Sequence, residues 1–494
     1  MKAQHIFTTL LIGGALTTLT ACKDFVDLEP ISEATTINAY TTAKGAEAAL
    51  TSIYDQFSQE YYIWDNIVLS DVISDNYYAG GDDPQIFAVD KLDLSPTNGR
   101  FYNDWSQLYT SILRANTVLK RVPLINDPTF APGRQDQILG EAAFLRALHY
   151  FNLVKNWGPV PLILDPTESP APAVTNVPRS SEKEVYDQII KDLEFAIAKL
   201  PDTYGGDASI SKARATKGAA NALLAKAYAQ RADRDYSKVL QYCNSVIGSP
   251  AGYKLLENYP ELFDGAHYNN AESIMEVQFV GGNEANWGPQ MLLPPSVSGD
   301  GWRKFVTPSK NLVAAFDSEG DVVRKNSSIL FEAIEGWVDE FWGNTKGASI
   351  PFAYKWKSAS GWASTNRQYI VRLADIILLR AEALNELGRT AEARSALDSI
   401  RRRAGLQPST TSTQMALRAA ILKERRLELC QEGQRWDDLK RAGIAVETMN
   451  NLNEIDLRTN QRVNYNMTSQ KLLLPIPQQE LNRNKKLEQN PGYN

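Results

Sequence analysis

The sequence predicts a mainly helical protein in which pairs of antiparallel helices support a loop-rich face with a few short strands. Apolar residues recur at helical spacing over most of residues 42–247 and 367–445. Two of these helical segments resemble each other. Between them, residues 248–366 lose the helical period and are rich in Gly, Pro, Ser and Asn. We therefore expect one domain over residues 42–494, with a helical scaffold and a ligand-facing region at 248–366.

Residues 1–21 have the layout of a secretory signal peptide. Lys2 supplies a positive charge, and an apolar stretch from Ile6 to Leu19 leads through small residues to Cys22. The apolar stretch is too short to span a bilayer comfortably. Its end, Leu-Thr-Ala-Cys, resembles the lipobox of bacterial lipoproteins, in which the cysteine becomes the acylated first residue. A plain signal peptide with an incidental cysteine is the alternative.

After Cys22, residues 22–41 are acidic and lack a helical period, which predicts a flexible leader. The whole chain has a formal charge of −6, and this mild acidity is not the basic footprint of a nucleic-acid-binding protein, so we expect no nucleic-acid partner. Cys243 and Cys430 fall in helix-like stretches, which favours buried free thiols over a disulfide.

Four helices are predicted in the first half of the scaffold. Trp105 to Val122 forms one apolar face, stopped by Pro123, and Ser181 with Glu184 forms a capping box that opens another helix. The other two helices carry these apolar faces: Ala46, Leu50, Ile53, Tyr54 and Phe57; Phe144, Leu148 and Phe151.

Two later segments each indicate a helix, a short turn and a second helix. They are Leu223–Ile247 and Leu378–Ile400, and each places a small residue, Ala227 or Ala383, where a neighbouring helix needs close approach. This pattern is typical of tetratricopeptide-type helix pairs, whose faces become buried by stacking on their neighbours. Any antiparallel helix pair shares much of it.

The aperiodic region contains one predicted strand, because Met275, Val277 and Phe279 alternate with polar residues. A stretch of this length without periodicity inside a helical protein is more often functional than accidental.

Recognisable enzyme motifs are absent. The chain has three histidines and no H-E-x-x-H, paired C-x-x-C, Walker A or G-x-S-x-G sequence, so we assign no catalytic residue, cofactor or metal ligand. A pair of carboxylates for glycoside hydrolysis stays open, since only the fold decides their spacing. The charged stretch Glu424–Arg441 is interpreted as ion pairs around a packed Trp436.

Aromatic residues are the most informative functional signal. Six of the ten tryptophans fall between Trp287 and Trp362. An indole offers a rigid flat face that suits the C–H face of a sugar ring, while nearby polar side chains bond its hydroxyls. The alternative is that these rings anchor loops to the core. The candidate ligand contacts are Trp287, Trp302, Trp337, Trp342 and Trp362, with Trp64, Tyr77 and Tyr78 from another loop-like part.

Nine segments in order resemble the SusD/RagB family of outer-membrane lipoproteins along nearly the whole mature chain. These are "ACKDFVDLEP", "DWSQLYTSILRANTVL", "GEAAFLRALHYFNLVKNWGPVPL", "RSSEKEVYDQIIKDLEFAIAKLP", "RATKGAANALLAKAYAQ", "VRLADIILLRAEALNELG", "ERRLELCQEGQRWDDLKR", "LLPIPQQEL" and "QNPGYN".

The resemblance implies a helical fold with four tetratricopeptide-like pairs and no enzymatic activity. It implies a surface protein that binds glycans and forms the lid of a SusC-like, TonB-dependent transporter in the outer membrane, held there by an acylated Cys22. The matching segments define the scaffold, so Trp105, Trp157 and Trp436 inside them are assigned to the core. A surface glycoside hydrolase, a protein-binding tetratricopeptide scaffold and an importer subunit for a non-glycan nutrient remain the alternatives.

Overall fold

Helices dominate the protein, as predicted. The computed structural model describes residues 40–166, 176–299, 304–336, 338–339, 341–343, 345–456 and 459–493. The predicted signal peptide, Cys22 and acidic leader lie outside the described residues, as do Trp302 and Trp337. Within the described residues, no helix is both long and apolar enough to cross a membrane.

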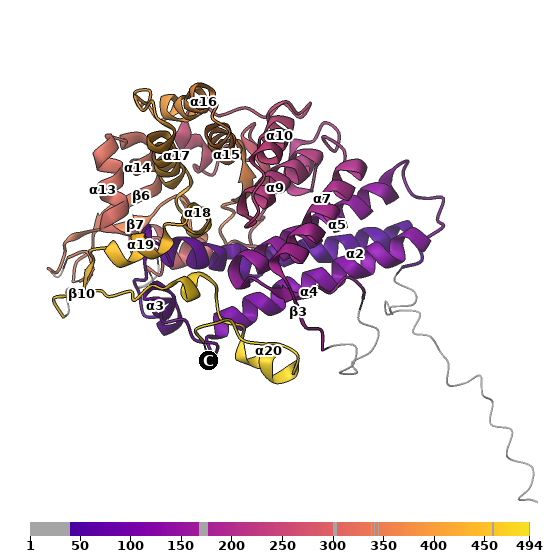
Figure 1. The fold of residues 1–494 in the computed structure, drawn as a ribbon, viewed down its shortest axis with the longest axis horizontal. Helices are drawn as coiled ribbons and strands as arrows, with labels where there is room; N and C mark the ends of the chain where they lie inside the picture. The colour runs from indigo at the N-terminus through magenta and orange to yellow at the C-terminus, as the bar shows by residue number, and fades with distance from the viewer. Residues whose placement is uncertain are drawn as a thin grey trace, which may run out of the picture.

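Four long helices form one half of the scaffold and run side by side (Figure 1). Helix α5 lies in the middle and contacts the other three, which is why it is buried along nearly its whole length. The capping box predicted from Ser181 and Glu184 opens α7 and is confirmed. The four helices are α2 (Ala43–Tyr54), α4 (Gly99–Arg121), α5 (Arg134–Trp157) and α7 (Glu182–Lys199).

Helix pairs form the other half, and both predicted pairs are confirmed. Ala227 and Ala383 are fully buried, and α10 packs against α15, so that the two pairs stack. Stacking buries faces that a lone pair would leave in water. The helices are α9 (Lys217–Gln230) with α10 (Tyr236–Ile247), α15 (Leu373–Glu386) with α16 (Thr390–Arg403), and α17 (Gln414–Leu429).

Short elements connect these helices and build the loop-rich side. The short helices are α3 (Pro84–Asp90), α8 (Ala208–Ala213), α11 (Gly288–Leu292), α12 (Pro295–Ser298), α13 (Lys310–Glu319), α14 (Val322–Ser328), α18 (Arg435–Ala442), α19 (Ala445–Asn451) and α20 (Gln478–Arg483). Single turns of 3-10 or π-helix are η2 (Asp55–Ser58), η3 (Tyr61–Asp65), η4 (Val68–Val72), η5 (Val122–Leu124), η6 (Tyr259–Leu262), η7 (Ser360–Trp362) and η8 (Ser469–Leu472).

The strands of the described residues form five two-stranded antiparallel sheets. They are β1 (Tyr77–Tyr78) with β5 (Thr307–Pro308), β2 (Val160–Pro161) with β3 (Arg179–Ser180), β4 (Ser273–Val277) with β8 (Gln368–Arg372), β6 (Ile329–Ala333) with β7 (Ser349–Ala353), and β9 (Ile455–Asp456) with β10 (Gln461–Arg462).

Residues 248–366 are more regular than predicted. The predicted strand exists as β4, but α13, α14 and the β6–β7 hairpin were not predicted. Helix α13 has only ten residues between its cap Ser309 and Gly320, which has a left-handed φ of 66°. Such a short helix shows too few turns for its apolar period to stand out.

A single large hydrophobic cluster runs through both halves, from Ala46 to Ile476. Trp105, Trp157 and Trp436 are at most 3% exposed, which confirms their assignment to the core. Cys243 and Cys430 are buried free thiols, also as predicted.

The charged stretch Glu424–Arg441 forms ion pairs, as predicted, and Glu428 is the most connected of them. Its carboxylate contacts Arg324 at 3.0 Å, Arg372 at 2.6 Å and Arg403. Burial alone would raise the pKa of Glu428, but the three guanidinium groups hold it well below its usual range. The residue is therefore charged in the interior.

A second buried cluster places two carboxyl groups against each other. Arg100 binds Glu60, Asp65 and Asp83 at 2.7–3.0 Å. The carboxyl group of Asp65 also lies against that of Asp104. Both carboxyl oxygens of Asp104 are buried, and no other hydrogen-bond donor reaches them in the described part of the chain. Burial raises the pKa of Asp65 to about 7, although the charge of Arg100 offsets part of this rise. The pKa of Asp104 is raised well above its usual value by burial and by the neighbouring charges of Asp65 and Glu60.

We infer that Asp65 and Asp104 share one proton, and this predicts a pH dependence. The folded protein keeps the proton to a higher pH than the unfolded chain, so the free energy of unfolding falls as pH rises from about 4 through 7. Asp104→Asn removes one acid and should raise stability at about pH 8 by about 1–4 kcal/mol. Urea unfolding between about pH 5 and pH 9 measures it.

Asp83→Asn is the matched control, because it removes another carboxylate of the Arg100 cluster but leaves the shared proton in place. It should keep the wild-type pH slope. An Asp104→Asn slope equal to that of the wild type would contradict the shared proton.

Truncating a core indole should cost far more stability than truncating an exposed ring. Trp436→Ala removes a side chain that is 2% exposed, and the cavity should cost about 3–5 kcal/mol of unfolding free energy. Phe195→Ala, at a ring that is 40% exposed on α7, should cost less than about 1 kcal/mol. Thermal and urea unfolding of both variants test this, and equal losses would contradict the assignment.

Candidate functional site

The carboxylate of Asp339 gathers donors from three separate segments of the loop-rich side. It accepts a hydrogen bond from the Tyr78 hydroxyl at 2.8 Å and pairs with the buried ammonium of Lys304. The backbone amides of Phe341 and Trp342 donate to its other oxygen at 3.0 and 2.7 Å. Four donors hold this carboxylate in place, and it in turn fixes the loop that carries the two aromatic rings.

The local backbone explains why these segments meet. Strand β1 pairs with β5, so that Tyr78 lies opposite Thr307. Gly80 then passes so close to the chain that a Cβ there would lie 2.4 Å from the carbonyl oxygen of Lys304. Only glycine permits this approach. A bridge between Asp339 and Gly343 closes the turn that presents Phe341 and Trp342.

Beside Asp339 lies a cavity of about 270 Å³, which we call the Tyr78 cavity. The rings of Tyr78 and Phe341 lie 5.3 Å apart, and Leu452 is buried next to them. Burial and the neighbouring Asp339 raise the pKa of Tyr78 well above 10, so its hydroxyl stays protonated. The other lining residues, mostly polar, are Lys310, Asn311, Asn453, Glu454 and Ile455.

This combination of aromatic walls and polar residues suits a sugar ring. The partly exposed ring of Phe341 can contact C–H groups, and the amides and charged groups can bond hydroxyls, while the 3% exposed Tyr78 supports the wall from behind. The volume is close to the lower end of small-ligand sites, about 300 Å³. The Tyr78 cavity therefore fits a short part of a longer molecule.

Trp342 extends the aromatic surface next to the Tyr78 cavity. Its ring is half-buried, packs 5.5 Å from Phe331 of β6, and lies 5.8 Å from the ammonium of Lys310. The ring is thus held in position while part of it stays open to solvent.

Trp362 is an exposed indole on the loop-rich side. Three consecutive residues, Ser360, Gly361 and Trp362, have φ values of 49°, 60° and 76°. Two of them are not glycine, so the turn is strained, and strained turns of this kind gather at functional sites. The side chain of Trp362 is 39% exposed.

Trp64, Tyr77 and Trp287, the other predicted contacts that the structure describes, pack against the core. Trp64 and Tyr77 are each 1% exposed, which argues against direct contact with a ligand. The ring of Trp64 packs 5.9 Å from that of Trp287 and under the guanidinium of Arg100. Trp287 is half-buried against the core. Of the described candidates, Tyr78 lines the cavity, although it is only 3% exposed, and Trp342 lies next to the cavity.

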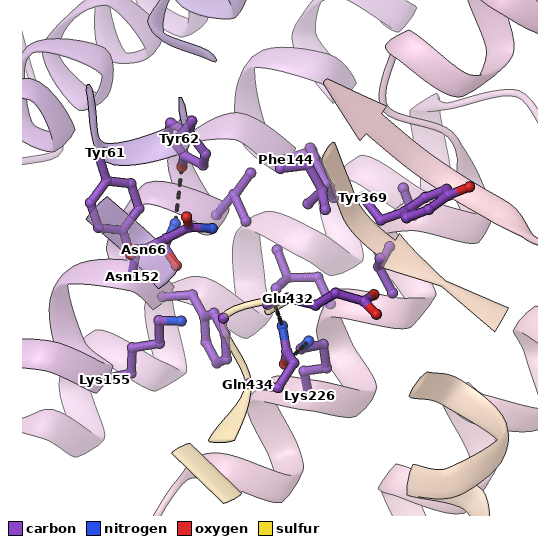
Figure 2. A pocket seen from close by; sticks show the side chains of 17 residues that line it. Tyr61, Tyr62, Asn66, Phe144, Asn152, Lys155, Lys226, Tyr369, Glu432 and Gln434 are labelled. Atoms are coloured by element: carbon purple, nitrogen blue, oxygen red, sulfur yellow. Dashed lines mark hydrogen bonds between the residues drawn. The ribbon is translucent and has the colours of Figure 1, made fainter. Parts of the chain in front are cut away.

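Another cavity lies inside the helical scaffold, where side chains from η3, α5, α9 and β8 converge (Figure 2). Its free volume is only about 50 Å³. Lys226 is already bound to Asp375 and Gln434 at 2.7 Å, and Asn152 donates to the hydroxyl of Tyr62. This space is too small for a sugar ring.

Sequence reasoning missed several residues of the Tyr78 cavity. Phe341 was missed because only tryptophans were counted in the aperiodic region, although it precedes Trp342 directly. Asp339 and Asn453 carry no local signal, since their role depends on segments far away in sequence. Within the described residues, no group of three or more His, Cys, Asp or Glu could hold a metal ion.

Comparison with known proteins agrees with the fold. A model of the SusD family matches residues 325–493, and a model described as starch-binding and associating with the outer membrane matches residues 18–229. The SusD-like protein P38 of Formosa agariphila is 27% identical over the whole of both chains. The starch-binding protein SusD of Bacteroides thetaiotaomicron is 26% identical over 72% of each chain.

Two solved structures show the same architecture. A laminarin binding SusD-like protein is 29% identical and has a TM-score of 0.74, covering 92% of this chain and 100% of the other. A SusD homolog from Bacteroides thetaiotaomicron shares the fold with a TM-score of 0.78 at 24% identity, covering 93% and 99%. With two family models covering both ends and full-length relatives, the chain belongs to the SusD/RagB family.

Proposed function

We propose that this protein captures a glycan at the cell surface and binds part of it in the Tyr78 cavity, with Trp342 as the stacking platform. The observation that carries this proposal is the Asp339 carboxylate, whose four donors hold Tyr78 and Phe341 at one cavity and Trp342 next to it. Trp362, exposed on its strained turn, is the second platform.

Family membership supports a carbohydrate ligand. One relative is a starch-binding protein, and one structural neighbour binds laminarin. Relatives in this family are described as binding proteins, which supports capture rather than catalysis. In the structure, the facing carboxyl groups Asp65 and Asp104 are at most 1% exposed, so this pair is closed to a substrate.

The same proposal places the protein on the outer membrane. An acylated Cys22 would hold it there, and the acidic leader would act as the tether. Stable residence needs more than one acyl chain on this cysteine. We further propose that the folded body closes over a SusC-like, TonB-dependent transporter as its lid and delivers the bound glycan to it.

Trp342→Ala should weaken glycan binding by about 1–3 kcal/mol, because it removes an indole that stays partly open to solvent. The melting temperature should change little, since the ring is only half-buried. Calorimetric titration with laminarin and soluble starch measures the binding, and the same samples are assayed for released sugar. Trp362→Ala tests the second platform in the same way.

Phe195→Ala is the matched control, an exposed ring on α7 outside the loop-rich side. It should bind like the wild type. If Trp342→Ala and Trp362→Ala both bind normally, the ligand does not use these rings. Release of sugar from a bound glycan would instead favour a glycoside hydrolase.

Cys22→Ala should remove acylation and leave the folded protein soluble or with its signal peptide uncleaved. Fatty-acid labelling and membrane fractionation measure this, with Cys243→Ala as the matched control because that thiol is buried. If Cys22→Ala still labels and still fractionates with the outer membrane, the anchor lies elsewhere.

Extraction of native membranes with mild detergents should recover the protein together with a much larger transporter. Size-exclusion chromatography and mass spectrometry identify the partner. The lid hypothesis fails if the protein is always a lone monomer while the transporter is present in the same extract.

A further inference from the structure

A separate cavity of about 320 Å³, which we call the Tyr54 cavity, lies between the helical scaffold and the loop-rich side. One wall comes from the end of α2 and from η2, with Tyr54 and Phe57. The opposite wall comes from the end of β4 and the residues after it, with Val277 and Phe279. The volume lies within the range of small-ligand sites, about 300–1,000 Å³. The Tyr54 cavity and the Tyr78 cavity share no lining residue.

Hydrogen bonds hold both walls of the Tyr54 cavity in place. The Tyr54 hydroxyl donates to the carboxylate of Glu141 at 2.7 Å and accepts from the backbone amide of Ala215 at 2.9 Å. On the other side, the side-chain amide of Gln278 donates to the carbonyl oxygen of Ser209 in α8 at 2.8 Å. Because the walls are fixed before a ligand arrives, binding there costs little ordering of the protein.

Four charged side chains line the Tyr54 cavity, and two of them are engaged in ion pairs within the protein. These pairs are Arg214 with Glu141 at 3.3 Å and Glu276 with Arg367 at 2.5 Å. Asp55 lies 3.9 Å from Arg114, yet its side chain is 62% exposed, and Glu284 is exposed as well. The carboxylates of Asp55 and Glu284 are therefore the charged groups most open to a ligand.

This lining suits a neutral molecule that is rich in hydroxyl groups. A purely apolar ligand would take water from the two exposed carboxylates without replacing its hydrogen bonds, and the same carboxylates would repel an anionic ligand. Sugar hydroxyls donate well to carboxylates. The ring of Tyr54, which is half-buried, can contact the C–H groups of a sugar. A neutral sugar unit thus satisfies both the apolar wall and the polar rim.

The strained turn of Trp362 packs against the loop that carries Glu284. A backbone bridge joins Gly281 to Glu284, and a Cβ at Gly281 would lie 3.4 Å from the carbonyl oxygen of Ala363. Trp362 does not line the Tyr54 cavity, but its exposed indole follows directly on this contact. An exposed aromatic ring therefore lies on a segment next to the rim of the cavity.

We propose that the Tyr54 cavity is a second carbohydrate-binding site, which takes a short neutral part of a glycan. Tyr54 contacts the sugar face, and Asp55 and Glu284 accept hydrogen bonds from its hydroxyls. The inference rests on the proposed function for the class of ligand, but its site is separate from the Tyr78 cavity. One protein molecule then binds two sugar segments at once.

The test counts bound oligosaccharides on the full mature protein, with maltotriose and laminaritriose as short neutral probes. Equilibrium dialysis gives the number bound per chain, and calorimetric titration gives the affinities. The wild type should bind two molecules of at least one probe. Thr51→Trp places a bulky ring at an exposed residue of the cavity lining and should reduce this number to one. Glu284→Gln should weaken the same binding event about two- to ten-fold, because it removes the charge from an acceptor of sugar hydroxyls.

Ser245→Trp is the matched control for Thr51→Trp. Ser245 is exposed on α10, outside both cavities, and its hydroxyl donates to the carbonyl oxygen four residues earlier, as that of Thr51 does. This variant should still bind two molecules of the probe. Thermal unfolding of both variants checks that each is folded.

The inference is overturned if the wild type binds one molecule that Trp342→Ala removes and Thr51→Trp leaves, an outcome in which the proposed function stands. It is also overturned if Thr51→Trp keeps both binding events. If Thr51→Trp removes the binding while Trp342→Ala leaves it unchanged, the Tyr54 cavity stands and the Tyr78 cavity falls as a site. If neither probe binds, both sites fall.

Discussion

The buried carboxylate of Glu428 joins three parts of the chain that are far apart in sequence. Arg324 comes from α14, Arg372 from the end of β8 and Arg403 from the end of α16, and all three contact it. Arg372 and Arg403 also share Glu272, at 2.8 and 2.9 Å. Removing one partner of such a network leaves unpaired charge in the interior, which commonly costs about 3–5 kcal/mol. This ion-pair network therefore connects the helix pairs to the loop-rich side.

A short series of contacts connects the ion pairs of Glu428 to the Tyr78 cavity and so determines where the cavity lies. Helix α14, which carries Arg324, leads directly into β6, and Phe331 of β6 packs on Trp342. Strand β7 contacts β5, which pairs with the strand of Tyr78. Asp339 repeats the principle of Glu428 on a smaller scale, because a buried carboxylate again gathers donors from distant segments. Burying each of these two carboxylates costs desolvation free energy, but its ion pairs and hydrogen bonds favour one arrangement of the surrounding segments.

Local pattern was enough to predict the long helices and both helix pairs. An apolar face repeated over several turns, a capping box at Ser181 and small residues at Ala227 and Ala383 are all signals within a short window. Helix α13 and the β6–β7 hairpin were not predicted, because each is too short to show a clear apolar period and each depends on packing partners elsewhere in the chain. The contact between Asp65 and Asp104 could not be foreseen, since the two residues lie on different elements and are brought together only by the fold.

By itself the sequence determined the mainly helical class, the stacked pairs and the concentration of aromatic rings in residues 248–366, because these depend on residue type and spacing along the chain. Only the tertiary structure decided which rings meet a cavity and which lie in the core. Trp64 and Trp342 have the same side chain, yet one is 1% exposed and the other is partly open to solvent. The reason is that exposure depends on what packs against a residue, and those neighbours come from distant parts of the chain.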